Sequence, residues 1–416
     1  MQNIVFAITL FSVPLFFGVT SLLGVAYDGA GSSNLYRNYC ILVFVLSMSC
    51  IFFGRKNYSA KQSSTLTYWV LFIYILAGIL SGFVNDSLWL TLVAFSLPAA
   101  CIGAYFANDR GNALFKMAKL LDVLFVILTV CVISLSTRLF MAVATGDSEY
   151  SQRLSYYAAL CFVLDIFLFL YGKSYDRFKF FKNKYVQFLY FCLLPTFIVV
   201  IFFSGGRGGF VVVAVGIFAI AFMYRKVKWK SLVSGVVVIF VFTSLLSYYS
   251  EEVSSDIMAK YQENQRRVLA YIDVEDLKID MTQTSGRDHV YQDSWNMFLN
   301  SPIIGYGIFD YKTALKEKYD QPYPHNLFLE WLLQGGVFFF CIWFYAFCMM
   351  LVRLHRLIRQ DIRYVILLPF LVHALVELMF TGTYMGNTFF WFVLSFSLNK
   401  KISSHPPLTL KTERTV

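Results

Sequence analysis

Charged residues are scarce in this sequence: they make up 14% of its 416 positions, whereas hydrophobic residues make up 58%. A soluble domain carries about a quarter charged residues, so the composition argues against a soluble protein. Apolar runs long enough to cross a bilayer recur along the chain. In lipid every backbone polar group must be paired internally, so these runs should be helices. The sequence therefore predicts an all-α polytopic membrane protein.

Twelve apolar runs are candidate transmembrane helices. They cover residues 2–26, 36–54, 65–84, 88–107, 119–144, 155–172, 184–203, 208–224, 229–247, 326–352, 364–380 and 383–398. The first run lacks a basic stretch before it, so we expect a retained helix rather than a cleaved signal peptide. The predicted domains are a membrane domain with helices 1–9 (1–247), a large external loop (248–324), a membrane domain with helices 10–12 (325–398) and a tail (399–416). We call residues 248–324 the outer segment.

Basic residues are unevenly divided between the loops. Every second loop, starting after the second run, carries three to five of them. The opposite short loops carry only Arg37, Arg153 and Arg207. Because basic loops stay in the cytoplasm, both termini are expected to be cytoplasmic and the outer segment periplasmic. The net charge of +10 is thus a topology signal rather than the mark of a nucleic-acid partner.

The outer segment contains no cysteine, since all eight cysteines fall within predicted spans. This argues against a disulfide framework or a Cys-rich metal site. The segment contains 13 acidic and 8 basic residues, and we nevertheless expect it to be folded. Apolar residues recur at helical spacing over 252–271 and 285–300. Ser285 followed by Asp288 resembles a capping box, and "GYG" at 305–307 predicts a turn.

One arginine stands among four glycines in "SGGRGG", residues 204–209, directly ahead of the eighth predicted span. A helix N-terminus presents unpaired N–H groups and positive dipole charge. Glycines let the backbone approach a ligand closely. Arg207 and Gly208 at such a helix start are suited to binding a phosphate. The alternative is an ordinary interfacial turn whose arginine extends toward water.

A second arginine lies in the first turn of the helix predicted over 285–300. A basic side chain there opposes the helix dipole, so Arg287 fits better if an anion also binds. The alternative is a solvated loop arginine paired with Asp288. No Asp-rich cluster or metal-ligand spacing accompanies the two arginines, so we expect them, rather than a metal ion, to neutralise a diphosphate.

The third feature is "YPHNLFLEWLLQGGV", residues 323–337, at the outer start of the tenth span. His325 titrates near neutral pH and can act as a base or as a hydrogen-bond donor. Glu330 lies one turn below Asn326, and an ionisable residue near the membrane is a functional candidate. The alternatives are a helix-cap Asn beside an interfacial His, and a Glu330 that serves helix packing.

Together these stretches resemble the O-antigen ligase/O-antigen polymerase superfamily. "SGGRGG", "SGRDHVYQDSWNMFLNSPIIGYGIFDY" and "PHNLFLEWLLQGGV" match in order and spacing, over about 200–340. The layout of about twelve spans with one large external loop is also similar. The resemblance implies transfer of a glycan from an undecaprenyl-diphosphate carrier on the periplasmic face of the bacterial inner (cytoplasmic) membrane.

The resemblance assigns the family's essential arginines to Arg207 and Arg287 and its loop histidine to His325. Asn326 and Gly336 match the pattern that follows the histidine. The arginines would hold the donor diphosphate, and the histidine would activate or orient the acceptor hydroxyl, with no cofactor or metal ion. The expected catalytic residues are His325, Arg287 and Arg207, and the expected substrate-binding residues are Arg207, Gly208, Arg287, Asn326 and Glu330.

The resemblance leaves the acceptor open. Polymerases of the superfamily use a carrier-linked repeat unit, and ligases use lipid A–core. The acidic outer segment favours a polymerase, since a site for a phosphate-rich core is expected to be more basic. Chain-length regulators or other polysaccharide-assembly proteins are further expected partners, besides the lipid bilayer. A rival of another class is a lipid-linked oligosaccharide flippase, but the spans before residue 200 carry few charges for a polar path, mainly Asp122 and Asp165.

Overall fold

The structure is a computed structural model that describes residues 2–22, 34–53, 96–108, 113–142, 148–204, 207–224, 287–307, 310–319 and 323–400. Within these ranges the regular elements are helices, and no strand occurs. Five described helices are long and apolar enough to cross a membrane, and a sixth is added if the first two short helices count as one bent span. An all-helical membrane protein is thus confirmed for these ranges. The predicted spans over 65–84 and 229–247 and the predicted helix over 252–271 lie outside them.

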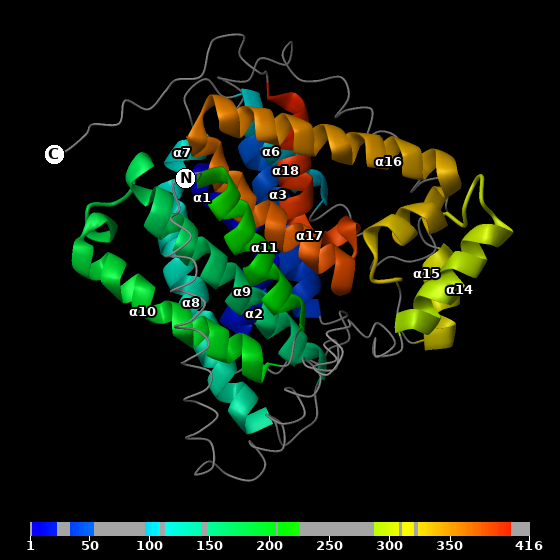
Figure 1. Cartoon of the computed structure of the whole chain (residues 1–416), viewed down its shortest axis with the longest axis horizontal. Helices are drawn as coiled ribbons and strands as arrows, with labels where there is room; N and C mark the ends of the chain where they lie inside the picture. The colour runs from blue at the N-terminus through cyan, green and yellow to red at the C-terminus, as the bar shows by residue number, and fades with distance from the viewer. Residues whose placement is uncertain are drawn as a thin grey trace.

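The N-terminal half forms one packed group of helices (Figure 1). Its α-helices are α1 (Gln2–Leu10), α2 (Ser12–Leu22), α3 (Asn34–Phe53), α6 (Leu97–Asn108), α7 (Ala113–Lys116), α8 (Ala118–Ala142), α9 (Ser148–Tyr171), α10 (Lys184–Phe203) and α11 (Arg207–Tyr224). The bounds of α10 coincide with a predicted span. The prediction of one continuous helix over 2–26 is wrong, because α1 and α2 meet at an angle of 83°. Pro14 lies just after this bend, and proline both lacks an N–H donor and clashes with the preceding turn.

The C-terminal part contains α14 (Arg287–Asn300), α15 (Asp310–Tyr319), α16 (Leu327–Gln360), α17 (Leu368–Phe380) and α18 (Thr388–Asn399), with 3-10 turns η7 (Ile362–Leu367) and η8 (Tyr384–Gly386). The helix predicted over 285–300 is present as α14, although Ser285 of its predicted cap lies outside the described residues. α15 has no counterpart among the predicted helices. In Figure 1, α14 and α15 lie together at one side of the helical group.

α9 is the most deeply buried of the long helices. In its most apolar stretch 83% of the residues are buried, compared with 28% for α10 and for α16. It packs against α8, α10, α11 and α17. α6 and α18 approach closely at Gly103, where an added Cβ would lie 2.5 Å from the carbonyl oxygen of Phe392. α9 therefore forms the centre of the bundle, whereas α10 and much of α16 present apolar surface outward, as lipid-facing helices do.

A buried ion pair fixes α8 to the loop that follows α9. The Nε atom of Arg177 donates to both carboxylate oxygens of Asp122 at 3.0 Å, and the two side chains are 1% and 0% exposed. Nη1 of the same arginine donates to the carbonyl of Leu168 at 3.2 Å. Asp122, one of the few charges predicted within the spans, therefore has a structural partner.

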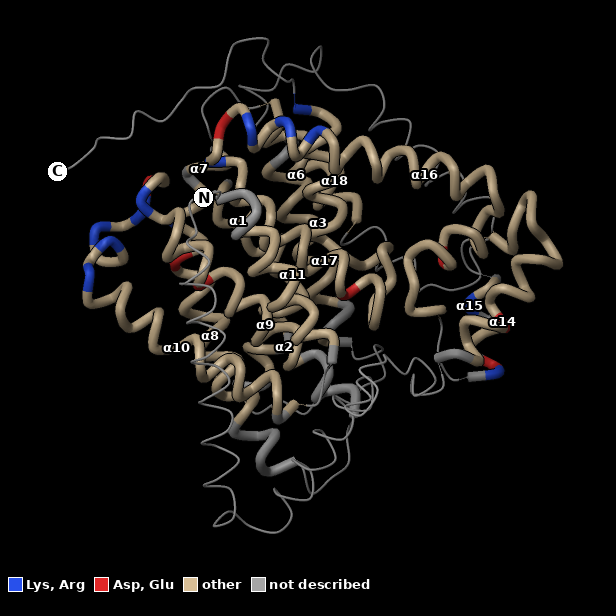
Figure 2. The backbone as a smooth tube through the Cα atoms, in the orientation of Figure 1, with Lys and Arg blue, Asp and Glu red and all other residues tan. Residues whose placement is uncertain are grey.

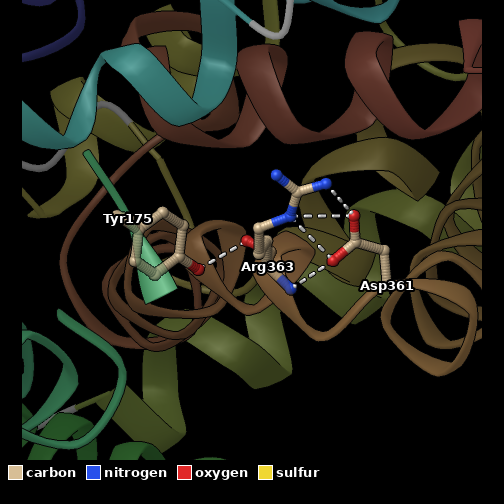
Figure 3. Close-up of polar contacts among 3 residues, drawn as sticks. All are labelled: Tyr175, Asp361 and Arg363. Atoms are coloured by element: carbon tan, nitrogen blue, oxygen red, sulfur yellow. Dashed lines mark hydrogen bonds and ion pairs between the residues drawn. The ribbon is translucent and has the colours of Figure 1, made fainter. Parts of the chain in front are cut away.

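Basic segments gather at one end of the bundle, toward the top and upper left of Figure 2. The turn between α16 and α17 lies at this end. There the Asp361 carboxylate accepts hydrogen bonds from the backbone N–H and the guanidinium of Arg363, at 2.9 and 2.7 Å. The Tyr175 hydroxyl donates to the Arg363 carbonyl at 2.5 Å (Figure 3). These contacts tie the loop after α9 to the start of η7.

Candidate functional site

The central feature of the candidate site is a break inside α16. The φ and ψ angles are −146° and 22° at Gly335 and 65° and −159° at Gly336. Glycine adopts such a positive φ without the steric cost that a Cβ imposes, so the pair ends one helix and starts another. The first part folds back along the second, and the rings of Trp331 and Trp343 stack with centroids 5.9 Å apart. The predicted continuous span over 326–352 is therefore wrong at this point.

The turn over 301–307 holds this break through the backbone. The N–H of Val337, just after the break, donates to the carbonyl oxygen of Pro302 at 2.8 Å. Two N–H groups of the turn donate to the last two carbonyls before the break: Tyr306 to Leu333 at 2.7 Å, and Gly307 to Gln334 at 2.9 Å. A break leaves helix N–H and C=O groups without intrahelical partners. Here the turn supplies partners for them.

The turn and the break approach too closely for side chains. A Cβ added to Gly305, whose φ is 68°, would lie 2.6 Å from the nitrogen of Gly335. A Cβ on Gly336 would lie 2.3 Å from the carbonyl oxygen of Ile303. "GYG" in the outer segment and "QGG" in α16 thus form one structural unit. A small hydrophobic core of Phe298, Tyr311, Leu315 and Leu333 supports it.

His325 stands just before α16 in an unusual backbone conformation. Its φ is 52°, and it is the one non-glycine residue with a positive φ among those described. The Tyr291 hydroxyl of α14 donates to its carbonyl oxygen at 3.4 Å, and the Tyr323 ring meets its imidazole edge-on at 4.8 Å. A non-glycine residue in this region carries steric strain, which tends to be kept where function requires it. The packing around His325 thus presents its side chain in a defined place.

Asn326 is the N-cap of α16. Its side-chain oxygen accepts hydrogen bonds from the backbone N–H groups of Phe328 and Leu329, at 3.0 and 3.2 Å. An N-cap of this kind satisfies helix donors that would otherwise be unpaired. The helix-cap alternative for Asn326 is therefore confirmed, and contact with substrate stays a prediction.

Glu330 lies at the centre of a buried polar network. It is 1% exposed, and its Oε1 atom accepts hydrogen bonds from the hydroxyls of Tyr311 in α15, at 2.8 Å, and Thr383, at 2.5 Å. Gln334 lies 3.5 Å from the same oxygen and accepts a hydrogen bond from Tyr384. The carboxylate thus joins the outer segment, α16 and the turn before α18, which favours the packing role of Glu330.

Lys312 lies beside this network and is 3% exposed. Among the described residues its ammonium group has no hydrogen-bond partner. Burial lowers the pKa of Lys312 from 10.5 to about 8, and the nearby charge of Glu330 opposes this shift. Burial also raises the pKa of Tyr311 well above its ordinary value of 10.0, and Glu330 adds to the effect. Burial in this network therefore destabilises the charged form of Lys312.

The two predicted arginines each begin a helix. Arg207 is the first residue of α11, and Arg287 is the first residue of α14. Both helices begin toward the lower side of Figure 1, away from the basic end at the top of Figure 2. Gly208 is packed against α9, where an added Cβ would lie 1.8 Å from the Tyr156 hydroxyl oxygen. The glycine beside Arg207 therefore permits close helix packing, a role that composition did not reveal.

Several residues that complete this region could not be selected from local sequence patterns. Tyr311 and Lys312 come from a helix that was not predicted, and Thr383 lies 53 positions from Glu330. A search for polar residues in the turns that flank the last span would have selected Thr383. Among the described residues, no group of three or more His, Cys, Asp or Glu side chains could hold a metal ion.

These features define the class of the protein: it is a multi-pass helical membrane protein in which a turn of the outer segment holds a break in a long apolar helix. Residues 188–344 match the family model described as O-antigen ligase. The match spans α11, the outer segment and the break in α16, and it confirms the resemblance to the O-antigen ligase/polymerase superfamily. Over these residues the chain is therefore similar to the O-antigen ligase family. No curated protein and no solved structure matched the chain.

Proposed function

We propose that the protein is a surface polysaccharide (O-antigen) polymerase. It transfers a glycan from an undecaprenyl-diphosphate carrier onto a carrier-linked repeat unit at the periplasmic face of the inner membrane. The observation that carries the proposal is the placement of its motifs. Arg207 and Arg287 each begin a helix on the side opposite the basic end, and His325 is held in a strained conformation just before the helical part that leads to the break.

In the proposed reaction the acceptor hydroxyl oxygen attacks the anomeric carbon of the donor sugar. The bond between that carbon and the phosphate oxygen breaks, and its electron pair leaves with the diphosphate. Arg207 and Arg287, with the N–H groups at their helix starts, stabilise this growing negative charge. His325 activates or orients the acceptor hydroxyl. Direct attack predicts inversion at the anomeric carbon.

The proposed transfer does not use a metal ion, because two guanidinium groups supply the positive charge that a divalent cation would otherwise bring. This part of the proposal is tested by assaying purified protein in a chelator. We expect transfer to persist, and strict dependence on added Mg²⁺ would contradict metal-free chemistry.

The proposal places about twelve spans in the membrane, both termini in the cytoplasm and residues 248–324 in the periplasm. The grouping of Lys and Arg segments at one end of the described helices supports this orientation (Figure 2). Reporter fusions test it: fusions at the C-terminus should report the cytoplasm, and fusions within 248–324 should report the periplasm.

A ligase that joins the polysaccharide to lipid A–core is the second candidate, and the description of the matching family favours it. Deletion of the gene distinguishes the two functions on a lipopolysaccharide gel run beside the lipid-linked fraction. A core that bears one repeat unit, with no ladder, supports the polymerase. A bare core with long chains on the carrier supports the ligase. Lipid-linked sugar that crosses proteoliposomes without forming polymer or conjugate would instead support a flippase.

A further inference from the structure

A second polar cluster lies at the end of α17, apart from the residues selected from the sequence. Glu377 stands one turn before the end of this helix at Phe380. The Nδ2 atom of Asn387, from the turn before α18, donates to its Oε2 atom at 2.8 Å. The Nδ1 atom of His373 lies 3.6 Å from the same oxygen. The Glu377 side chain is 32% exposed, so a substrate can reach it, in contrast to the buried Glu330.

His373 is buried beside this carboxylate. It is 2% exposed, and among the described residues neither ring nitrogen has a hydrogen-bond partner. Buried polar atoms without partners are rare and call for an explanation. The ring packs edge-on against Phe389 and Tyr156, with centroid distances of 5.5 and 6.2 Å, so its orientation is fixed with Nδ1 facing Glu377. A small approach of the two side chains would complete a hydrogen bond.

The cluster adjoins the start of α11. Tyr156, which packs on His373, has its hydroxyl against Gly208, the residue that follows Arg207. α17 itself packs against both α9 and α11. Contacts thus run from the first turn of α11 through Tyr156 and His373 to the Glu377 carboxylate. An accessible carboxylate is therefore linked, through Tyr156 and His373, to the helix start proposed to bind the donor diphosphate.

This inference rests on the proposed function. We propose that Glu377 is a further catalytic residue, which takes the proton of the acceptor hydroxyl as its oxygen bonds to the anomeric carbon. The electron pair of the broken carbon–oxygen bond leaves with the diphosphate, and the protonated Glu377 returns its proton to water. His373 and Asn387 are positioning residues that hold the carboxylate, and His325 then orients the acceptor.

The substitution Glu377→Gln tests this role, because the amide keeps an oxygen that can accept from Asn387. We would measure single-turnover transfer, donor binding and thermal unfolding of the purified protein with a polyprenyl-diphosphate-linked glycan. Removal of a general base slows a reaction by about 10²–10⁴-fold. We expect such a loss in Glu377→Gln, with unchanged donor binding and unfolding temperature, and partial recovery of transfer in Glu377→Asp. The matched control is Glu317→Gln, which changes an exposed carboxylate of α15 and should leave transfer at the wild-type rate.

The pH profile adds a readout that a purely structural role would not move. Besides His373, the groups seen to face Glu377 or its imidazole partner include Asn387 from the turn before α18 and Tyr156 from α9. We expect the fall in wild-type transfer at acidic pH to be absent in Glu377→Gln and displaced in His373→Gln. Two results would overturn the catalytic role of Glu377. One is wild-type transfer in Glu377→Gln, and the other is a loss of transfer that is accompanied by an equal loss of donor binding or by unfolding of the protein. A wild-type protein that transfers nothing would instead overturn the proposed function.

Discussion

The backbone N–H of Val337 donates to the carbonyl oxygen of Pro302 at 2.8 Å. This bond joins two parts of the chain that the sequence presents as separate motifs, one in the outer segment and one in an apolar helix. It closes the break at Gly335 and Gly336, and the short helix that begins after His325 leads directly into that break. The position of the histidine is therefore set by the contact between the outer segment and α16.

The first prediction concerns Gly336. Gly336→Ala should lower the free energy of unfolding by more than about 2 kcal/mol, because a φ of 65° is strained for alanine and the Cβ would meet the Ile303 carbonyl at 2.3 Å. Thermal unfolding of the purified protein measures this effect. The control is Gly382→Ala, where the nearest atom to the added Cβ is 3.3 Å away. Equal losses in the two variants would show that the break is not a tight contact.

The second prediction concerns the bond between Tyr311 and Glu330. Tyr311→Phe removes a buried donor to a carboxylate at 2.8 Å, and hydrogen bonds to charged groups contribute about 1.5–3 kcal/mol. We expect easier proteolysis of the outer segment and a lower unfolding temperature. Tyr345→Phe, at a side chain that is 59% exposed, makes the same chemical change and should have little effect. A similar response of both variants would contradict the role of the network.

The third prediction is a pH dependence set by Lys312. Its pKa is lowered from 10.5 to about 8 by burial, so above pH 8 the unfolded chain binds more protons at this residue than the folded one. The free energy of unfolding should therefore rise from about pH 8 toward pH 10. Above pH 10 the raised pKa of Tyr311 acts in the opposite direction. Denaturant titrations at several pH values measure the rise.

Lys312→Met is the matched variant for this pH dependence. It keeps the length of the side chain and removes the charge, so the rise between pH 8 and pH 10 should become smaller. An unchanged slope in this variant would mean that other groups cause it.

The fourth prediction compares two ion pairs of the same region. Asp122→Ala leaves the buried Arg177 guanidinium without its carboxylate and should cost about 3–5 kcal/mol. Asp176→Ala breaks the pair with Lys119, whose side chains are 60% and 38% exposed, and should cost less than about 1 kcal/mol. Unfolding in denaturant measures both. Comparable costs would contradict the structural role of the buried pair.

Long apolar runs predicted much of this fold. α10 starts and ends where its run does, because in lipid an uninterrupted apolar stretch has no stable alternative to a helix. The break in α16 was not predicted, since a glycine pair within an apolar run fits a continuous helix equally well. The backbone that clamps this pair comes from residues 302–307, and no local pattern contains that information. α15 was not predicted because its charged residues interrupt any long apolar run.

The candidate site was predicted only in part. Arg207, Arg287 and His325 were selected at predicted helix starts, and each lies at a helix start in the structure, while their roles in the reaction stay predictions. Glu330 was selected as a lone acidic residue. Its partners Tyr311 and Thr383 are far from it in the sequence, one before it and one after it. His373, Glu377 and Asn387 lie in or next to apolar spans, and their relation appears only when α17 and the turn before α18 fold together.

The central claim is that Arg207 binds the leaving diphosphate, and a transfer assay on the purified protein tests it most directly. Wild type, Arg207→Ala and Arg356→Ala would receive a polyprenyl-diphosphate-linked glycan and an acceptor. Arg356 is an exposed arginine near the opposite end of α16, so its replacement removes the same charge away from the site. Removing one charge-stabilising donor slows a reaction by about 10²–10³-fold, and we predict that loss for Arg207→Ala alone. Wild-type transfer rates in Arg207→Ala would contradict the account.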